Sequence, residues 1–352
     1  MKASFHKYIL NFKQPSGTSR GVLLKKETWF LIIQENDKIG IGECGLFRGL
    51  SFDDQLDYSD KLQWVCNNIH LGKDVLWESL REWPSIQFGI EQAFLSFESN
   101  NPLILFPSRF TDGQQAIPIN GLIWMGEPAF MKEQIDQKIN QGFNCIKLKI
   151  GALDFDKELD LIRYIRTHFS PEMIEIRVDA NGGFGSSNAL FKLNQLAEYK
   201  IHSIEQPIKQ KQYDSMADLC LKTSLPIALD EELIGVINYS DKENLLQKIR
   251  PQYIILKPSL VGGLKGSEEW IKIAEKLNIG WWITSALESN IGLNAIAQWT
   301  YTLENKMPQG LGTGGLFTNN FESQLYVQNG HLWVDSKKEI SIESLLNQIS
   351  FK

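Results

Sequence analysis

The sequence has few cysteines, and no two of them stand close together. Four occur in 352 residues, at Cys44, Cys66, Cys145 and Cys220, without any Cys-x-x-Cys pair. That scatter argues against a disulfide framework and against a cysteine zinc site. The start of the chain also lacks the apolar core of a signal peptide. We therefore expect a reduced protein of the cytoplasm.

Long runs of one residue class are missing as well. No apolar run is long enough to cross a bilayer, and no long run of lysine and arginine is available to bind nucleic acid. The formal net charge is −6, and the hydrophobic share of 43% and the charged share of 22% are ordinary for a globular protein. We expect a small-molecule ligand, with neither a membrane nor a nucleic acid as partner, and either a monomer or a homo-oligomer.

The first third of the chain is typical of a small α+β module. Residues 5–41 are rich in β-forming side chains, and residues 53–68 and 85–98 carry apolar residues at helical spacing. Within the first of these stretches, residues 13–21 have the composition of a loop. Arg20 in this loop either reaches over a neighbouring site or lies solvated at the surface.

From residue 117 onward, short β-rich runs alternate with amphipathic helices. This rhythm predicts parallel strands joined by right-handed crossovers, and eight strands in about 200 residues favour a β/α barrel over an open sheet. The strand-like runs are 117–124, 145–150, 174–178, 203–208, 227–229, 253–256 and 281–285, with a weak eighth near Leu311. The helices between them include 128–141, 156–169, 188–199, 213–222, 264–277 and 293–302.

Charged residues gather where these runs end. Five consecutive runs deliver, in order, Lys149, Asp179, Glu205, Asp230 and Lys257. In a β/α barrel the carboxyl ends of the strands meet at one rim, so these five groups are predicted to converge there. Each carboxylate taken alone could be a helix cap or a turn residue. Five such residues in register on successive strands favour one site instead.

A second lysine precedes the first of these residues. Side chains two apart on a strand point to the same side, so Lys147 and Lys149 stand together on one face. Two ammonium groups buried side by side need anions opposite them, and the carboxylates of the later strands are available for that. The alternative interpretation is an edge strand whose lysines are solvated.

The three carboxylates point to a metal ion. Converging carboxylates repel one another unless a cation lies among them. Oxygen ligands without histidine or cysteine favour a hard ion, with Mg²⁺ the first choice. Such a site suits a reaction in which the metal binds a substrate carboxylate and a lysine removes the α-proton. The enediolate is then stabilised by the metal and the second lysine.

The rim residues stand in motifs that carry a family resemblance. These motifs are Lys147-Leu148-Lys149, Asp179-Ala180-Asn181-Gly182, Glu205-Gln206-Pro207, Leu229-Asp230-Glu231 and Lys257-Pro258. Together they resemble the enolase superfamily, and within it the muconate-lactonizing-enzyme-like group. The resemblance covers nearly the whole chain. It implies a modified TIM barrel, (β/α)7β, of residues 116–315 and an α+β capping domain of residues 1–115 that is completed by residues 316–352.

The same resemblance implies the roles of the rim residues. One Mg²⁺, for which Mn²⁺ can substitute, would be held by Asp179, Glu205 and Asp230. Lys149 and Lys257 would be the catalytic residues, one on either side of a small-molecule carboxylate substrate.

Three further stretches, residues 19–21, 285–293 and 310–315, are similar to the o-succinylbenzoate synthase family of that group. The similarity implies a syn dehydration of 2-succinyl-6-hydroxy-2,4-cyclohexadiene-1-carboxylate in menaquinone biosynthesis. Lys149 would take the α-proton and then protonate the departing hydroxyl, while Lys257 would stay charged and stabilise the enediolate. The implied substrate contacts are Lys147, Ser19, Arg20, Asn181, Ser285, Ser289, Gly312 and Thr313.

Three other functions compete with this one. Sibling enzymes that racemise N-succinylamino acids or epimerise dipeptides use the same two lysines. Dipeptide epimerases usually carry Asp-x-Asp at the eighth strand, where this chain has Gly312-Thr313-Gly314. A catalytically silent binding protein would be expected if a rim residue were lost, and all five are present. A metal-dependent barrel hydrolase usually needs histidine ligands, and the five histidines lie away from the rim.

Two further points concern the seventh run and the residues that follow it. Glu288 either orients a lysine or caps the next helix. Of Trp281 and Trp282, which begin the run, we expect one to pack inside the barrel and the other under a helix.

Overall fold

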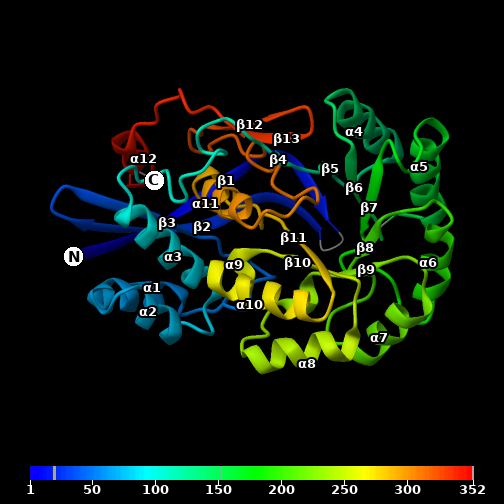
Figure 1. The fold of residues 1–352 in the computed structure, drawn as a ribbon, viewed down its shortest axis with the longest axis horizontal. Coiled ribbons are helices and arrows are strands. Elements are labelled where there is room, and N and C mark those ends of the chain that lie inside the picture. Colours follow the sequence, from blue (N-terminus) through cyan, green and yellow to red (C-terminus); the bar gives the residue numbers. More distant parts are fainter. Residues whose placement is uncertain (19–20, 152, 351–352) are drawn as a thin grey trace.

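The computed structural model describes residues 1–18, 21–151 and 153–350. Figure 1 shows capping elements from both ends of the chain on one side and a curled parallel sheet wrapped by helices on the other. Both termini lie on the side of the capping elements. The fold class predicted from the sequence, a modified TIM barrel with an α+β cap, is confirmed.

The N-terminal sheet is antiparallel, with the order β1-β2-β3. Its strands are β1 (Lys2–Thr18), β2 (Gly21–Glu35) and β3 (Lys38–Cys44). The loop predicted for residues 13–21 is wrong up to Thr18, because β1 continues through it. The pairing shifts register between Asn11 and Ser16, and Pro15 falls in that irregular stretch, where no ladder hydrogen bond is needed. Composition alone cannot show that a long partner strand holds such a segment extended.

Three helices pack beside this sheet: α1 (Tyr58–Asn67), α2 (Lys73–Ser79) and α3 (Pro84–Glu98). The last agrees with the predicted 85–98. The first begins at Tyr58 rather than at residue 53, because Asp53 is buried and accepts hydrogen bonds from the backbone N and the hydroxyl of Ser85 at 2.9 and 2.6 Å. Glycines let α3 lie close to β3, since a Cβ on Gly42 would stand 1.9 Å from the carbonyl oxygen of Gly89.

The barrel is a seven-stranded parallel sheet in sequential order from β5 to β11. The segment near Leu311, predicted as a weak strand, completes it through single bridges. Gln309 pairs in parallel with Ile119, and Gly310 pairs with Thr284. The strands are β5 (Gly121–Ile123), β6 (Cys145–Lys149), β7 (Glu175–Asp179), β8 (Ser203–Glu205), β9 (Ile227–Leu229), β10 (Tyr253–Leu256) and β11 (Gly280–Ile283).

Helices follow the strands and cover the outside of the barrel, as Figure 1 shows. One of them, α8 (Tyr239–Ile249), lies between β9 and β10, where no helix was predicted. Its Lys242 is buried on the same side as Leu245 and Ile249, so a charged residue interrupts the apolar face of this helix. The others are α4 (Pro128–Asn140), α5 (Phe155–His168), α6 (Ala189–Ala197), α7 (Tyr213–Lys222), the short α9 (Pro258–Val261), α10 (Gly263–Lys276) and α11 (Asn290–Thr302).

The C-terminal tail returns to the N-terminal part of the chain. β12 (Leu325–Gln328) and β13 (His331–Val334) form a small antiparallel sheet with β4 (Ile117–Pro118). The predicted first barrel strand, 117–124, is therefore split between two sheets. Helix α12 (Ile342–Ser350) buries Leu345 and Ile349 in one cluster with side chains of β1 and β2.

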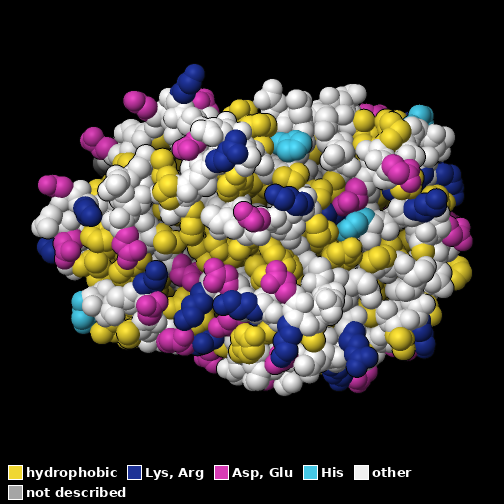
Figure 2. All heavy atoms as spheres, in the orientation of Figure 1, with side chains coloured by type: hydrophobic (Ala, Val, Ile, Leu, Met, Phe, Trp, Pro, Cys, Tyr) yellow, Lys and Arg dark blue, Asp and Glu magenta, His cyan; other side chains and the backbone are white. Residues whose placement is uncertain are grey.

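The two tryptophans of β11 divide as predicted. Trp282 joins Ala228 and Ile255 in a small cluster, and Trp281 belongs to the large core formed with the helices. On the surface, Figure 2 shows acidic and basic side chains interspersed over the face drawn. Among the described residues, no helix has both the length and the apolar character needed to cross a membrane.

Candidate active site

The structure brings the predicted rim residues together. Lys149, Asp179 and Glu205 end three adjacent strands and occupy paired positions across β6, β7 and β8. Paired positions on neighbouring parallel strands place their side chains on the same face. Asp230 and Lys257 directly follow β9 and β10 and so reach the same rim. The strand-end spacing in the sequence was sufficient to find this group.

Ammonium and carboxylate groups alternate within this cluster. The Nζ of Lys149 lies 2.6 Å from Asp179 Oδ2. The Nζ of Lys147 lies 2.9 Å from the same oxygen and also donates to Glu205. Lys257 donates to Asp230, and its Nζ stands 3.9 Å from Glu205 Oε1. The three carboxylates are almost fully buried, at 0–3% exposed, so these ion pairs are shielded from water.

Burial and neighbouring charge act on the pKa values of this cluster in opposite directions. Burial raises the pKa of Asp179, but the positive charges of Lys147 and Lys149 lower it by a larger amount. The pKa of Asp179 therefore lies well below the ordinary value. Burial lowers the pKa of Lys147, but Asp179 and Glu205 raise it above the ordinary value. For Glu205, burial and the charge of Asp179 raise the pKa well above the ordinary value. Glu205 is thus the carboxyl whose charge is least compensated.

The donor set fits a divalent cation. Asp179, Glu205 and Asp230 supply only carboxylate oxygens, which suit Mg²⁺. Glu205 Oε1 is buried and has no hydrogen-bond partner in the part of the chain that the structure describes, an arrangement that costs free energy unless a cation or donor satisfies it. Lysine ammonium groups lie against these carboxylates, and among the described residues no three acidic, histidine or cysteine side chains are spaced to hold a metal. Binding of one cation by all three carboxylates would therefore need a rearrangement of this cluster.

A cavity of about 280 Å³ opens above the lysines. Its walls include seven of the predicted site residues, Lys147, Lys149, Lys257, Asn181, Ser285, Gly312 and Thr313. The carboxylates themselves do not line it, because the lysines stand between them and the cavity. The hydroxyls of Ser285 and Thr313 lie 2.8 Å apart and join the ends of β11 and the closing segment.

The N-terminal part of the chain also contributes to the cavity. Gln14 and Leu23 come from the two arms of the β1–β2 hairpin, and Phe47 and Leu50 from the loop after β3. These residues could not be identified from the sequence, because one polar and three apolar side chains far from the rim in the sequence carry no local signal of a ligand. Ser19 and Arg20, which were predicted to contact the substrate, lie outside the described residues.

One predicted substrate contact is not at the cavity. Ser289 is fully buried, its hydroxyl donates to Glu43 Oε2 at 2.5 Å, and it also caps α11 by accepting from Ile291 N. The prediction failed because a serine at a strand end and a serine at a helix cap look alike in sequence. Glu43, on β3, also accepts a hydrogen bond from the backbone N of Gly292 at 2.9 Å. It therefore connects the N-terminal sheet to the start of α11.

The role of Glu288, left open by the sequence, is structural. Its carboxylate accepts from the hydroxyl of Ser259 and, at 2.7 Å, from the backbone N of Ala286. It thus joins the cavity-lining loop of residues 285–287 to α9, which begins one residue after Lys257. Leu287 in that loop has a left-handed backbone, with φ of 63°, a strained conformation that such contacts hold in place.

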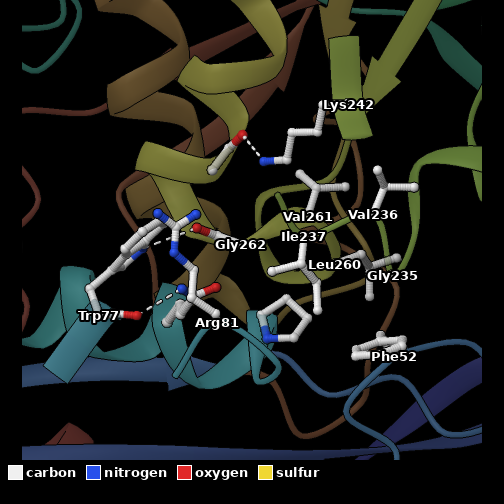
Figure 3. Close-up of a pocket in the computed structure, with 13 residues that line it drawn as sticks. Phe52, Trp77, Arg81, Gly235, Val236, Ile237, Lys242, Leu260, Val261 and Gly262 are labelled. Carbon is white, nitrogen blue, oxygen red and sulfur yellow. Dashed lines mark hydrogen bonds between the residues drawn. The ribbon is translucent and has the colours of Figure 1, made fainter. Parts of the chain in front are cut away.

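Figure 3 shows a second, much smaller pocket of about 20 Å³ between the cap and the barrel. It contains Trp77, whose indole donates to the carbonyl oxygen of Gly262 at 3.2 Å, and the buried Lys242, which donates to the carbonyl of Gly266. That volume holds about one water molecule. The pocket includes none of the rim residues. It therefore belongs to the packing interface between the capping elements and the barrel and is not a substrate site.

Comparison with known proteins identifies the family of the chain. Residues 130–343 match the model of the family described as enolase C-terminal domain-like. The o-succinylbenzoate synthase of Desulfotalea psychrophila is 46% identical, over 95% of this chain and 99% of the relative. The crystal structure of MenC from Desulfotalea psychrophila superposes with a TM-score of 0.85 at 42% identity, covering 95% of this chain and 99% of that one.

More distant structures share the fold. A substrate-liganded complex of the L-Ala-D/L-Glu epimerase from Bacillus subtilis gives a TM-score of 0.81 at 17% identity, over 95% of this chain and 96% of that one. At that identity the likeness bears on the fold alone.

The ion-pair cluster leads to a prediction about stability without metal. Lys147→Met is expected to lower the free energy of unfolding of the metal-free protein by about 3 kcal/mol, because it leaves buried carboxylates uncompensated. Added Mg²⁺ is expected to recover part of this loss by supplying the missing charge. Urea unfolding in EDTA and in Mg²⁺ measures both effects.

Lys222→Met serves as the matched control, because the Lys222–Asp218 ion pair is half exposed. It should change stability by less than about 1 kcal/mol. Equal stability of the Lys147→Met and wild-type proteins in EDTA would show that Lys147 is not the counter-ion of these acids.

Proposed function

The chain belongs to the enolase C-terminal domain-like family, and on that basis we propose that it is an enzyme of the o-succinylbenzoate synthase type. Its reaction is the syn dehydration of 2-succinyl-6-hydroxy-2,4-cyclohexadiene-1-carboxylate to o-succinylbenzoate. The observation that carries this proposal is a cavity floored by Lys149 and Lys257, from opposite sides of the barrel, above three buried carboxylates. The 46% identity to an o-succinylbenzoate synthase over 95% of the chain supports the choice among related reactions.

Asp179, Glu205 and Asp230 are the residues that would hold one Mg²⁺, or Mn²⁺ in its place. When bound, the cation supplies positive charge that stabilises the additional negative charge of a substrate carboxylate during α-proton removal. Lys147, which donates to Glu205, lies next to this position and contacts the substrate carboxylate.

Lys149 moves the proton. As the neutral amine it takes the proton from the α-carbon, and the C–H electron pair enters the conjugated carboxylate as an enediolate. The new ammonium then gives the proton to the hydroxyl on the same face of the ring. The C–O bond breaks, water leaves, and the electron pair forms the double bond that makes the ring aromatic. One residue serves as base and acid because both events occur on one face.

Lys257 stays charged throughout. Burial lowers its pKa, but Asp230 and Glu205 raise it above the ordinary value, which favours the ammonium form. Its charge stabilises the enediolate from the side opposite Lys149. Asn181, Ser285, Gly312 and Thr313 line the rest of the cavity and contact the substrate.

We place this reaction in menaquinone biosynthesis and in the cytoplasm. The named relative supports the pathway, and four buried cysteines without a disulfide among the described residues agree with a reducing compartment. A racemase or epimerase activity is the second candidate. It is supported by partial similarity to such enzymes, for instance 31% identity to the D-Ala-D/L-Ala epimerase of Cytophaga hutchinsonii over 49% of this chain and 45% of that relative.

The purified protein is expected to form o-succinylbenzoate when Mg²⁺ is present. EDTA should stop the reaction, and added Mg²⁺ or Mn²⁺ should restore it, because the carboxylates need the cation to polarise the substrate. Product formation is followed by mass spectrometry. Activity that persists in excess EDTA would remove the metal from the proposal. Exchange of the α-proton of an N-succinylamino acid in deuterated water, with no dehydration, would favour the second candidate.

The two lysines are tested separately. Lys149→Ala and Lys257→Ala should each lower kcat by at least about 10³-fold, because each removes a group that acts in the transition state. Circular dichroism and thermal unfolding should show a folded protein. Lys222→Ala, on the exposed face of α7, is the control and should keep full activity. Normal turnover by either rim variant would mean that the roles are misassigned.

A further inference from the structure

A fourth buried acid stands beside the three carboxylates. Glu231 follows Asp230 in the short 3-10 turn Glu231–Leu233 and is 2% exposed. Its Oε1 accepts a hydrogen bond from the side-chain Nδ2 of Asn181 at 3.0 Å. In the sequence it stands only as the last residue of the Leu229-Asp230-Glu231 motif and as a poor candidate for a helix cap. A buried acid that faces the site and serves neither as a helix cap nor as a proposed metal ligand needs another explanation.

Asn181 connects this acid to the proposed base. Its Oδ1 accepts from Lys149 Nζ at 2.8 Å, while its Nδ2 donates to Glu231. An amide presents a donor at one end and an acceptor at the other, whereas an ionised carboxylate can only accept. Glu231 therefore fixes which way round the amide lies. With Nδ2 held by Glu231, only the amide oxygen can face Lys149.

This orientation decides where the lone pair of Lys149 points. A neutral lysine nitrogen is tetrahedral and carries its carbon, two N–H groups and one lone pair. Lys149 Nζ has two acceptors, Asp179 Oδ2 at 2.6 Å and Asn181 Oδ1 at 2.8 Å. When both N–H groups are engaged, only one tetrahedral direction is left for the lone pair. Because Lys149 lines the cavity, that direction is available to the substrate.

We propose that Glu231 is a positioning residue that aims the Lys149 lone pair at the α-proton by holding the Asn181 amide in one orientation. The proposal rests on the proposed function, since it assumes that Lys149 is the base. The amide transmits orientation without placing another negative charge on the lysine. Asp179 is already in contact with Lys149, and a second carboxylate in the place of Asn181 would favour the ammonium, which cannot accept a proton, more strongly.

The neighbouring acid has a different task. Glu232 accepts from the side-chain amide of Gln206 at 3.0 Å and from the backbone N of Lys211 at 2.5 Å. It joins loops after β8 and β9 and has no hydrogen bond to Asn181. The two adjacent buried glutamates thus hold different partners. The effect on kcat that we expect of Glu231 comes from its contact with Asn181 and is not a general effect of buried charge in this turn.

The test compares Glu231→Met with Glu231→Gln. Methionine has similar length but cannot accept the amide hydrogen, so kcat should fall by about 10²-fold, as expected for a misaligned base. KM should change by less than about threefold, because Glu231 does not line the cavity and binding does not depend on the lone pair. Glutamine keeps a carbonyl acceptor and should restore kcat to within about threefold of wild type. A residue needed only for folding would not show this split or this rescue.

A double-mutant comparison locates the effect. Asn181→Leu should lower kcat at least as much as Glu231→Met, because it also removes the Lys149 acceptor and a proposed substrate contact. The double variant should lose little more than Asn181→Leu alone, because Glu231 acts through Asn181. Glu91→Met is the matched control: this buried acid accepts from the backbone N of Leu264 and of Lys265, away from the site. It is expected to reduce stability and leave kcat unchanged. Circular dichroism of every variant confirms that it is folded.

The outcomes separate the two proposals. Wild-type kcat in Glu231→Met, equal losses in the Met and Gln variants, or multiplied losses in the double variant would each overturn the positioning role. Failure of the wild-type protein to form o-succinylbenzoate would overturn the proposed function instead. The same variants would then be compared by α-proton exchange of an N-succinylamino acid in deuterated water, where slow exchange in the Met variant alone would still support the role of Glu231.

Discussion

The structure depends on the balance of charge at one rim of the barrel. Three carboxylates, Asp179, Glu205 and Asp230, are buried where water cannot stabilise them, and three lysines neutralise them. Breaking such a buried cluster is costly, so the positions of the strands that carry it are strongly constrained. These ion pairs leave Glu205 the least compensated of the three acids, and they hold the ammonium groups of all three lysines at the wall of the cavity.

The cap and the barrel are joined around this cluster. Glu43 of β3 holds the start of α11 through Ser289 and Gly292, and Glu288 fixes the cavity-lining loop to the helix after Lys257. The hydrogen bonds that these buried acids accept come from backbone N–H and hydroxyl groups, and the charge of the buried Lys26 acts on both. They place the apolar wall of the cavity against its charged floor, so the shape of the substrate site depends on both parts of the chain.

Much of this could be predicted from the sequence, for a physical reason. A β/α barrel delivers the end of each strand to one rim, so linear spacing translates directly into proximity for Lys149, Asp179, Glu205, Asp230 and Lys257. The failures arose where contacts distant in sequence decide the outcome. β1 continues beyond Pro15 because residues 16–18 pair with β2, and Ser289 lies away from the cavity, where its hydroxyl donates to Glu43. In the sequence, Glu231 cannot be distinguished from any other acid at the start of a turn, because its contact with Asn181 is visible only in the structure.

The most direct test of this account is a crystal structure with Mn²⁺, located by its anomalous scattering. The account predicts one ion bonded at about 2 Å by oxygens of Asp179, Glu205 and Asp230 together. It also predicts that the ammonium groups of Lys147 and Lys257 move off these carboxylates while Lys149 stays with Asn181. An ion bound elsewhere, or an ion bound with all the lysine pairs unbroken, would contradict it.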